Sequence, residues 1–378
     1  MCTFDVFEMQ VESLLSHPMR PLRILCLLLV LCQGLLWARG ASAQQAAAAT
    51  ATRPVMTLRV VGGLAGTSQY TKLEEPFWSR ELERLSAGKY RANIVPFDRA
   101  GLPGADMLRF LQLGVVPFGT VLMSSLVGTF PQYAAPDLVG LNPDMPTLRT
   151  HLAAFRPYLE RALREEQGIE ALAIYVYPAQ MLFCKKPIAS LSDLKGWRVR
   201  VSSVGQADFV EALGAEPVHT AFAQLVPRFE AGALDCAITG TLSGNTIGLP
   251  ELTTHLYALP LNWGMAIFGA NQAAWQALPM DLQDLLRREL PKLEAAVWAE
   301  SERDTAQGLV CNSGKPGCVV GRPGKMRIVP ASAADTVRSR EIFTSAVLPR
   351  WLQRCGPQCA QVWSQTIGRV SGLAAHSP

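Results

Sequence analysis

Few side chains in this chain are spaced for catalysis or for binding a metal ion. None of the four histidines after residue 43 (His151, His219, His255 and His376) stands in an H-x-x-x-H or H-E-x-x-H arrangement, the spacings that place two ligands on one helix face. The sequence also lacks a G-x-S-x-G nucleophile elbow and a Walker A loop. Nothing here supports an enzyme, a metal site or any other cofactor, although an exported enzyme stays open as an alternative.

A glycine-rich segment, residues 62–66 (GGLAG), is the one phosphate-loop candidate. It does not match G-x-G-x-x-G, and we interpret it as a turn between a strand and a helix. Such a turn can still point backbone N–H groups at an anionic group of a ligand.

The N-terminus has the three parts of an export signal. Arg20 and Arg23 flank the start of an apolar run, Ile24 to Ala38, and an A-S-A sequence ends at Ala43. A basic region, a short apolar region and a small-residue cleavage site are typical of a secretory signal peptide. We therefore expect residues 1–43 to be a signal peptide cleaved after Ala43 and the mature protein to be periplasmic, with Met19 as a possible true start.

Two alternatives for this segment are less well supported. An uncleaved anchor would need about 20 apolar residues, and this run has about 15. A lipoprotein would need a small residue before its cysteine, but Leu31 precedes Cys32.

Export would place the cysteines that follow the signal peptide in an oxidising compartment, where disulfides can form. There are six: Cys184, Cys236, Cys311, Cys318, Cys355 and Cys359. An even number in an oxidising compartment suggests disulfides, although six cysteines allow 15 pairings. Two local pairs are favoured, because the segment between Cys311 and Cys318 is rich in Gly and Pro and Cys355 and Cys359 bracket a Gly-Pro dipeptide. Zinc is the competing interpretation, but neither spacing is a usual zinc pattern and no histidine lies near.

Length and composition indicate a globular protein. The chain has 378 residues, 49% hydrophobic and 17% charged, which argues against disorder and favours about two domains. A formal net charge of only +4 gives no reason to expect nucleic acid as a partner.

Strand-like and helix-like segments alternate along the chain. We expect strands over residues 58–62, 90–97, 119–123, 170–177, 197–201 and 235–239. Helical periodicity covers residues 73–85, 107–113, 148–167, 206–213 and 223–230 and a long segment after Pro279. This alternation predicts βαβ units and a mainly parallel sheet.

Five short motifs occur in an order that resembles one protein family. They are residues 111–116 (LQLGVV), 192–200 (SDLKGWRVR), 209–218 (FVEALGAEPV), 229–235 (FEAGALD) and 271–285 (NQAAWQALPMDLQDL). The second resembles the "s-l-x-d-l-k-G-x-k-i-R" signature, and the third the "f-x-x-l-G-a-x-P-v" motif, of solute-binding proteins of tripartite ATP-independent periplasmic (TRAP) transporters. The resemblance covers roughly residues 57–365.

The resemblance implies an α/β, two-lobed periplasmic-binding-protein-like fold. Its ligand cleft would lie between discontinuous lobes, with a long connecting helix. Lobe I would comprise residues 55–178 plus 265–325, and lobe II residues 179–264 plus 326–378. The implied activity is capture of a small carboxylate-bearing organic acid and its delivery to the TRAP permease membrane subunits by a protein that is not an enzyme and that we expect to be a monomer.

Arg200, which ends the second motif, is the first candidate for the ligand site. The resemblance implies that it pairs with the ligand's carboxylate, and a guanidinium offers paired donors that match this group. Arg198 lies on the same face of the expected strand, and we expect it to reach outward near the strand end. A surface or structural salt bridge is the alternative role for Arg200.

Two positions depart from the family pattern. Gln180 stands where members often have a second arginine, and Thr239 stands where an asparagine often meets the ligand. Both changes lower the positive potential or the hydrogen-bonding capacity of the site. We therefore expect a monocarboxylate with an apolar or hydroxylated body rather than a C4-dicarboxylate, and dicarboxylate transport stays open.

Five further residues are weaker ligand-binding candidates. Ser68 and Gln69 follow the first expected strand, Ser124 and Ser125 follow the third, and Trp263 lies near the crossing between lobes. Helix capping, turn formation and core packing are the alternative roles for these three positions.

Three other functions stay open. The same binding module could serve as the ligand-sensing periplasmic subunit of a membrane receptor. An ABC-type binding protein or an exported α/β enzyme is a more distant alternative, since a fold does not fix a function.

Overall fold

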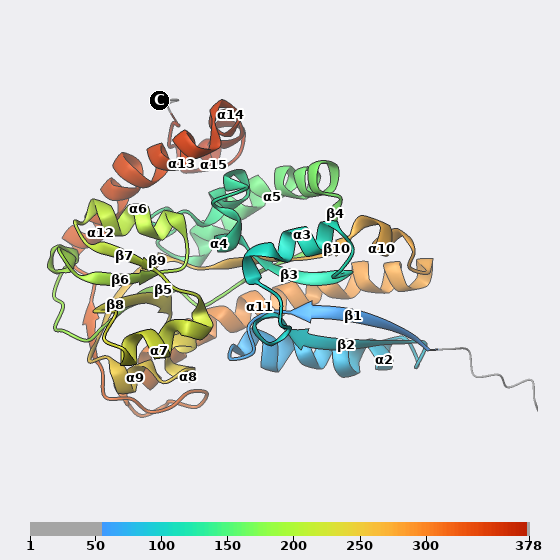
Figure 1. Ribbon diagram of the computed structural model, residues 1–378, viewed down its shortest axis with the longest axis horizontal. Coiled ribbons are helices and arrows are strands. Elements are labelled where there is room, and N and C mark those ends of the chain that lie inside the picture. The colour runs from blue at the N-terminus through green and yellow to red at the C-terminus, as the bar shows by residue number, and fades with distance from the viewer. Residues whose placement is uncertain (1–54, 376–378) are drawn as a thin grey trace, which may run out of the picture. The chain divides into compact units, whose positions relative to one another are not determined.

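The computed structural model describes residues 55–375. The predicted signal peptide and its cleavage site after Ala43 lie outside the described residues. Within the described part the strands form two separate sheets, and the chain passes from one to the other and back (Figure 1).

The first sheet has five strands. In spatial order they are β2 (Tyr90–Pro96), β1 (Met56–Gly62), β3 (Phe118–Leu122), β10 (Met265–Asn271) and β4 (Ile169–Val176). The pairs β2–β1 and β1–β3 are parallel, and β10 runs antiparallel to both β3 and β4.

The second sheet has six strands. In spatial order they are β11 (Arg327–Pro330), β9 (His255–Asn262), β5 (Gln180–Cys184), β8 (Cys236–Gly240), β6 (Arg198–Val201) and β7 (Glu216–His219). Here β5 runs antiparallel to β8 and β9, while β6 is parallel to both β7 and β8.

The expectation of mainly parallel strands is largely confirmed, because all strands but one point the same way in each sheet. The exceptions are β10 in the first sheet and β5 in the second. The cause is the chain crossing. Each of β5 and β10 begins directly after the chain has passed from the other sheet, so it starts at the edge where strands such as β1, β3 and β8 end. A strand that starts at that edge must run antiparallel to strands that end there.

Helices cover both sheets. Those that follow strands of the first sheet are η1 (Gln69–Glu74), η2 (Phe77–Glu81), α2 (Leu82–Leu85), η3 (Phe97–Arg99), η4 (Gly104–Asp106), α3 (Met107–Gln112), α4 (Met123–Leu126), η5 (Pro131–Asp137), α5 (Met145–Gln167), α10 (Gln272–Gln276) and α11 (Met280–Ser313). Those that follow strands of the second are η6 (Leu191–Leu194), α6 (Val204–Ala212), η7 (Phe222–Gln224), α7 (Leu225–Glu230), α8 (Thr241–Thr246), α9 (Leu249–Leu252), α12 (Ala333–Ile342), η8 (Phe343–Val347), α13 (Leu348–Cys355), α14 (Pro357–Gln365) and α15 (Ile367–Ser371).

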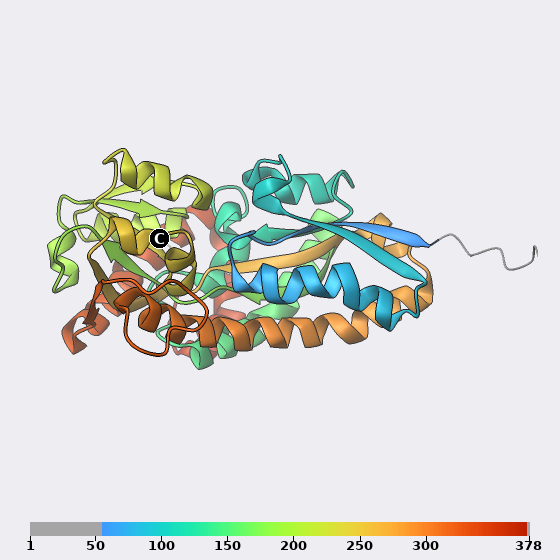
Figure 2. The ribbon, with the colours of Figure 1, turned by 90° about the horizontal axis from the view of Figure 1, so that it is seen from below.

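Helix α11 is the long connecting helix that the sequence predicted, and it contacts elements of both sheets (Figure 2). Near its middle the indole Nε1 of Trp298 donates to the carbonyl of Ile174 in β4 at 2.8 Å. Near its end the amide of Asn312 donates to the carbonyl of Thr241 in α8 at 2.9 Å. One continuous helix therefore ties the two halves of the described chain together.

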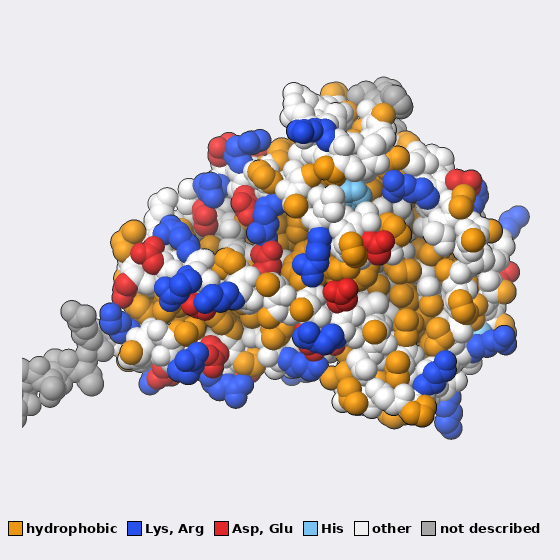
Figure 3. All heavy atoms as spheres, turned by 180° about the vertical axis from the view of Figure 1, so that it is seen from behind, with side chains coloured by type: hydrophobic (Ala, Val, Ile, Leu, Met, Phe, Trp, Pro, Cys, Tyr) orange, Lys and Arg blue, Asp and Glu red, His pale blue; other side chains and the backbone are white. Residues whose placement is uncertain are grey.

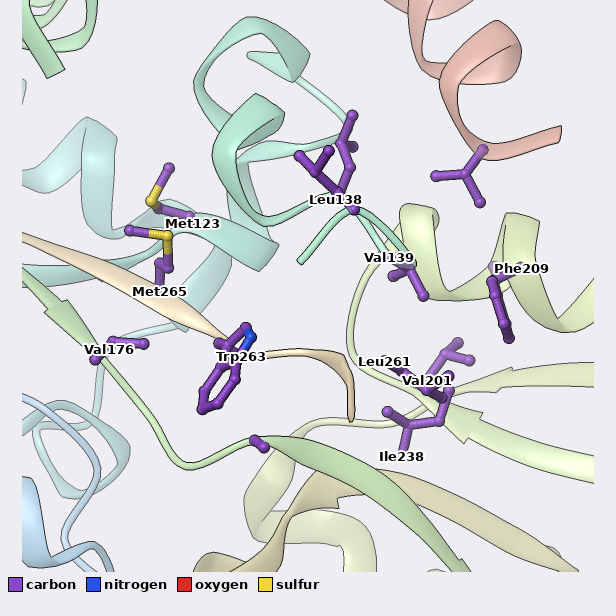
Figure 4. Close-up of a cluster of buried hydrophobic side chains, with 14 of the residues drawn as sticks. Met123, Leu138, Val139, Val176, Val201, Phe209, Ile238, Leu261, Trp263 and Met265 are labelled. Atoms are coloured by element: carbon purple, nitrogen blue, oxygen red, sulfur yellow. The ribbon is translucent and has the colours of Figure 1, made fainter. Parts of the chain in front are cut away.

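The hydrophobic core is continuous across the crossing. Val176 and Met265 of the first sheet belong to the same cluster of buried side chains as Val201 and Ile238 of the second, with Trp263 between them (Figure 4). The segments that connect the sheets are therefore packed rather than exposed linkers.

The C-terminal helix α13 contacts both halves, and the assignment of residues 326–378 to lobe II stays a prediction. The Trp351 indole donates to the carbonyl of Pro131 in η5 at 2.7 Å. Arg354, on the same helix, donates to the Asp208 carboxylate in α6 at 3.1 Å.

Three disulfides are present among the described residues. Cys311–Cys318 and Cys355–Cys359 are the two local pairs that the sequence favoured. Cys184–Cys236, for which the sequence gave no pairing, joins the adjacent strands β5 and β8.

The charged surface is mixed. On the face shown in Figure 3, basic side chains lie interspersed with acidic ones rather than gathered in one patch. Many of the described arginines form ion pairs, such as Arg84 with Glu81 and Arg91 with Glu83. No helix within residues 55–375 is both long and apolar enough to cross a membrane.

We predict that Gly308→Ala destabilises the protein. Gly308 lies where α11 meets α8, and a methyl group there would lie 2.4 Å from the backbone nitrogen of Leu242. Overpacking of this kind lowers the free energy of unfolding by about 1–3 kcal/mol, which urea denaturation of the oxidised protein would measure. Gly205→Ala in α6 is the matched control, because its nearest neighbouring atom is 3.9 Å away. Equal stability of the two variants would contradict the close contact.

Candidate functional site

A cavity of about 490 Å³ lies between the two sheets. Leu64, Phe97 and Leu122 from the first sheet's side and Phe222 from the second supply much of its apolar lining, with Met265 at the crossing. Its polar lining includes five of the eight predicted ligand-binding residues: Gln180, Arg200, Thr239, Ser124 and Ser125. A mainly apolar cavity with a few convergent polar groups is typical of a small-molecule site.

Arg200 is the central feature of this cavity. It stands in β6, and only 3% of the residue is exposed. Its Nε donates to the carbonyl of Thr220 at 2.9 Å, and its Nη1 donates to the carbonyl of Ile238 at 2.6 Å. Burial lowers the pKa of Arg200 to about 10, so the guanidinium is still positively charged at neutral pH.

No carboxylate among the described residues forms an ion pair with Arg200. Its neighbour Arg198 does have such a partner, because Arg198 Nε lies 3.2 Å from the Asp235 carboxylate. Burial tends to raise the pKa of Asp235, but hydrogen bonds from Arg198 and Lys186 outweigh burial and lower it to about 2. The sequence expectation that Arg198 reaches outward fits this arrangement, and Asp235 has a structural role.

Gln180 is held in one orientation by its neighbours. Its Oε1 accepts a hydrogen bond from Gln206 Nε2 at 2.9 Å, and the same Nε2 also donates to Asn262 at 3.0 Å. The Gln180 Nε2 lies beside Gly264, where a Cβ atom would be 2.3 Å from it and where φ is +73°. Glycine is therefore needed at position 264, both for its backbone conformation and for the space that Gln180 occupies.

The hydroxyl groups of the cavity differ in availability. Ser125 Oγ donates to the carbonyl of Leu122 at 2.7 Å, so its proton is already used. Within the described part of the chain, the hydroxyls of Thr239 and Ser124 make no such side-chain hydrogen bond, which leaves them free for a ligand.

Three predicted ligand-binding residues lie elsewhere. Trp263 is buried in the core and donates from Nε1 to the carbonyl of Asn142 at 3.2 Å (Figure 4). Ser68 hydrogen-bonds the carboxyl group of Asp304. Gln69 is buried, with its Nε2 donating to Glu74 at 2.5 Å. Their side chains are thus used within the protein, and none of them lines the cavity.

The cavity also contains residues that the sequence analysis did not select. They are Asp98, Tyr177, Ser202, His219, Thr220 and Ser243, among others. Ser202, Thr220 and Ser243 lie at or just beyond the ends of β6, β7 and β8, which are parallel. Because parallel strands end at the same sheet edge, strand ends were the signal that could have identified them.

The crossing between sheets is fixed by a buried carboxylate. Asp137 accepts hydrogen bonds from the backbone N–H groups of Trp263 and Gly264, at 2.9 Å and 2.8 Å, and from Asn262 Nδ2 at 3.0 Å. Burial raises the pKa of Asp137 to about 6, although these hydrogen bonds favour the ionised form.

A second buried carboxyl group lies beneath the cavity wall. Glu74 accepts a hydrogen bond from the backbone N–H of Gly63, in the glycine turn, at 2.6 Å. Burial raises the pKa of Glu74 to about 7. The glycine turn thus uses its Gly63 N–H inside the protein rather than for a ligand.

Comparison with known proteins identifies the family. Residues 64–320 match the family described as bacterial extracellular solute-binding protein, family 7. The chain belongs to this family. A solute-binding protein of Roseobacter denitrificans is 25% identical over 188 residues, which are 48% of this chain and 55% of the relative. The match thus spans about half the length of that curated relative.

Solved structures of the family share the fold. DctP7, a Bordetella pertussis extracytoplasmic solute receptor that binds pyroglutamic acid, has a TM-score of 0.72 at 21% identity, covering 82% of this chain and 99% of that one. A TRAP periplasmic solute-binding protein from Desulfovibrio salexigens with bound orotic acid has a TM-score of 0.73 at 18% identity, covering 83% of this chain and 98% of that one. The two-lobed architecture implied by the sequence motifs is confirmed.

We predict that Glu74→Gln removes part of the pH dependence of stability. Because the pKa of Glu74 is raised from 4.5 to about 7, the folded state binds this proton more tightly than the unfolded chain. The resulting stabilisation is complete below about pH 4.5 and is lost as the pH rises through about 7. The neutral variant should therefore be more stable than wild type at pH 8, by on the order of 1–3 kcal/mol in the free energy of unfolding obtained from urea denaturation.

The comparison needs measurements at both pH 5 and pH 8. Glu75→Gln removes the same charge from the adjacent, less buried position and is the control. If the stability difference between Glu74→Gln and wild type were the same at both pH values, the raised pKa would be refuted.

Proposed function

We propose that this protein captures a small carboxylate-bearing organic acid in the periplasm and delivers it to the membrane subunits of a TRAP permease. The observation that carries the proposal is the buried guanidinium of Arg200, which has no carboxylate partner among the described residues. Membership of an extracellular solute-binding family supports the same function.

The electrostatics of Arg200 favour an anionic ligand. A buried charge is costly unless it is paired, and carbonyl oxygens supply only partial compensation through Nε and Nη1. Arg200 Nη2 has no hydrogen bond to any described residue, so it can donate to a ligand carboxylate. A charge-assisted bond of this kind is stronger than a neutral one.

The rest of the cavity favours a ligand with a single carboxylate. Arg200 is its one arginine or lysine. Gln180 Nε2, Thr239 and Ser124 supply neutral hydrogen-bonding groups, and apolar side chains such as Phe97 and Phe222 supply contact area for a ligand body. Pyroglutamic and orotic acids, bound by the two structural neighbours, are both monocarboxylic acids.

Delivery requires that a partner distinguish loaded from empty protein. A ligand that contacts both walls of the cavity stabilises the closed arrangement of the two halves, and it shifts the population by its differential affinity for that state. The permease would then recognise the closed state. No chemical step on the ligand is required, and the predicted export signal supplies the route to the periplasm.

We predict that Arg200→Met abolishes tight binding while Arg198→Met does not. Removing one partner of a buried charged hydrogen bond costs about 2–5 kcal/mol, or about 30-fold to several-thousand-fold in affinity. The assay is isothermal titration calorimetry with a panel of mono- and dicarboxylates that includes pyroglutamate, orotate and succinate. Arg198 is the matched control, because it stands two residues away on the same strand but pairs with Asp235 outside the cavity.

Two results would count against the proposal. An unchanged dissociation constant for Arg200→Met would remove Arg200 from the site. Failure of wild type to bind any acid of the panel, or any acid that co-purifies with it, would contradict the function itself.

A further inference from the structure

Each side of the cavity carries one charged residue, and the two charges have opposite signs. Arg200 lines it from the second sheet, and Asp98 lines it from the first. The two do not form an ion pair, and Asp98 has no ion-pair partner within residues 55–375. The cavity is therefore dipolar rather than simply positive. His219, on the same side as Arg200, is its remaining lining residue that can carry a positive charge.

The Asp98 residue is solvent-exposed, but one oxygen of its carboxylate is held in place. It stands in the short helix η3, and its Oδ1 accepts a hydrogen bond from the backbone N–H of Ala65 in the glycine turn at 3.0 Å. The preceding residue is anchored to the same turn, since Phe97 N–H donates to the carbonyl of Gly63 at 3.2 Å. These two bonds fix the position of one carboxylate oxygen relative to the first sheet.

The second oxygen of Asp98 is available. Its Oδ2 makes no hydrogen bond to any of the described residues. In Asp235 and Asp137, by contrast, both carboxylate oxygens accept hydrogen bonds. An ionised carboxylate oxygen only accepts hydrogen bonds. A ligand group that bonds to this oxygen must therefore donate a hydrogen bond or carry a positive charge.

We propose that the cleft selects a small acid that also carries a hydrogen-bond donor, with one carboxylate for Arg200 and an N–H or ammonium donor for Asp98. The inference rests on the proposed function and adds the class of ligand. Asp98 is then a specificity-determining residue. A dicarboxylate that reached both sides of the cavity would place its second negative charge against Asp98, and like charges at close range repel each other.

The ligand's contacts with Arg200 and Asp98 also relate the class of ligand to closure of the cleft. Arg200 and Asp98 belong to different halves of the molecule, so only a ligand that satisfies both is held from both sides. A simple monocarboxylate would engage Arg200 alone and would stabilise the closed arrangement less. Selectivity for the donor group would thus be expressed in affinity and in the extent of closure.

The test uses two matched ligand pairs in calorimetric titrations. Succinamate replaces one carboxylate of succinate with an amide, and pyroglutamate differs from 5-oxotetrahydrofuran-2-carboxylate by an N–H in place of the ring oxygen. Wild type should bind the N–H member of each pair at least about 10-fold more tightly. Asp98→Asn, which can donate as well as accept, should reduce both preferences to about threefold or less.

Asp106→Asn is the control variant. Asp106 stands in the neighbouring turn η4, is exposed and does not line the cavity, yet its substitution changes net charge by the same amount. This variant should keep the wild-type preferences. If Asp98→Asn and Asp106→Asn instead reduced the two ligand preferences equally, the cause would be net charge, and the role of Asp98 would be overturned.

The outcomes separate this inference from the proposed function. If succinate binds wild type as tightly as succinamate, or if Asp98→Asn leaves both preferences unchanged, the proposed donor-bearing class of ligand is wrong, while a loss of binding in Arg200→Met still supports acid capture. If neither N–H member binds wild type, the inference is wrong. If Arg200→Met also leaves the binding of every acid unchanged, the proposed function fails with it.

Discussion

A positive charge is buried in the cleft with no protein carboxylate to balance it. Arg200 is held by two carbonyl oxygens, from Thr220 beyond β7 and from Ile238 in β8. These bonds orient the guanidinium without neutralising it. Most of the charged pairs elsewhere in the described chain are at least partly exposed to solvent, whereas here the compensation must come from outside the protein. In the proposed function, the anionic ligand supplies this balance.

The surrounding architecture places this charge where the two halves of the described chain meet. Strands of both sheets end at the cavity. The chain crosses from the second sheet back to the first at residues 262–264, and Asp137 accepts a hydrogen bond from each of these three residues. Helix α11 and the C-terminal helices connect the two halves at a distance from the cavity. The two halves are thus joined by packed, hydrogen-bonded connections rather than by a loose linker.

The sequence predicted the fold better than the site. Local periodicity and the ordered motifs identified most early elements. The strand expected at residues 90–97 is observed at residues 90–96, and the helix expected at residues 148–167 is observed at residues 145–167. Strand direction in β5 and β10 could not be read from periodicity, because it depends on where the chain crosses between sheets. Trp263 and Gln69 were misplaced for a related reason: proximity to a strand end or crossing does not reveal which way a side chain points. Asp98 was missed because no motif contains it.

A crystal structure of the protein with its captured acid tests the central claim most directly. The account predicts a ligand carboxylate at about 2.7–2.9 Å from the Arg200 guanidinium, between walls drawn from both sheets. An acid bound away from Arg200, or an Arg200 side chain that turns to pair with Asp98 while the ligand lies elsewhere, would contradict it.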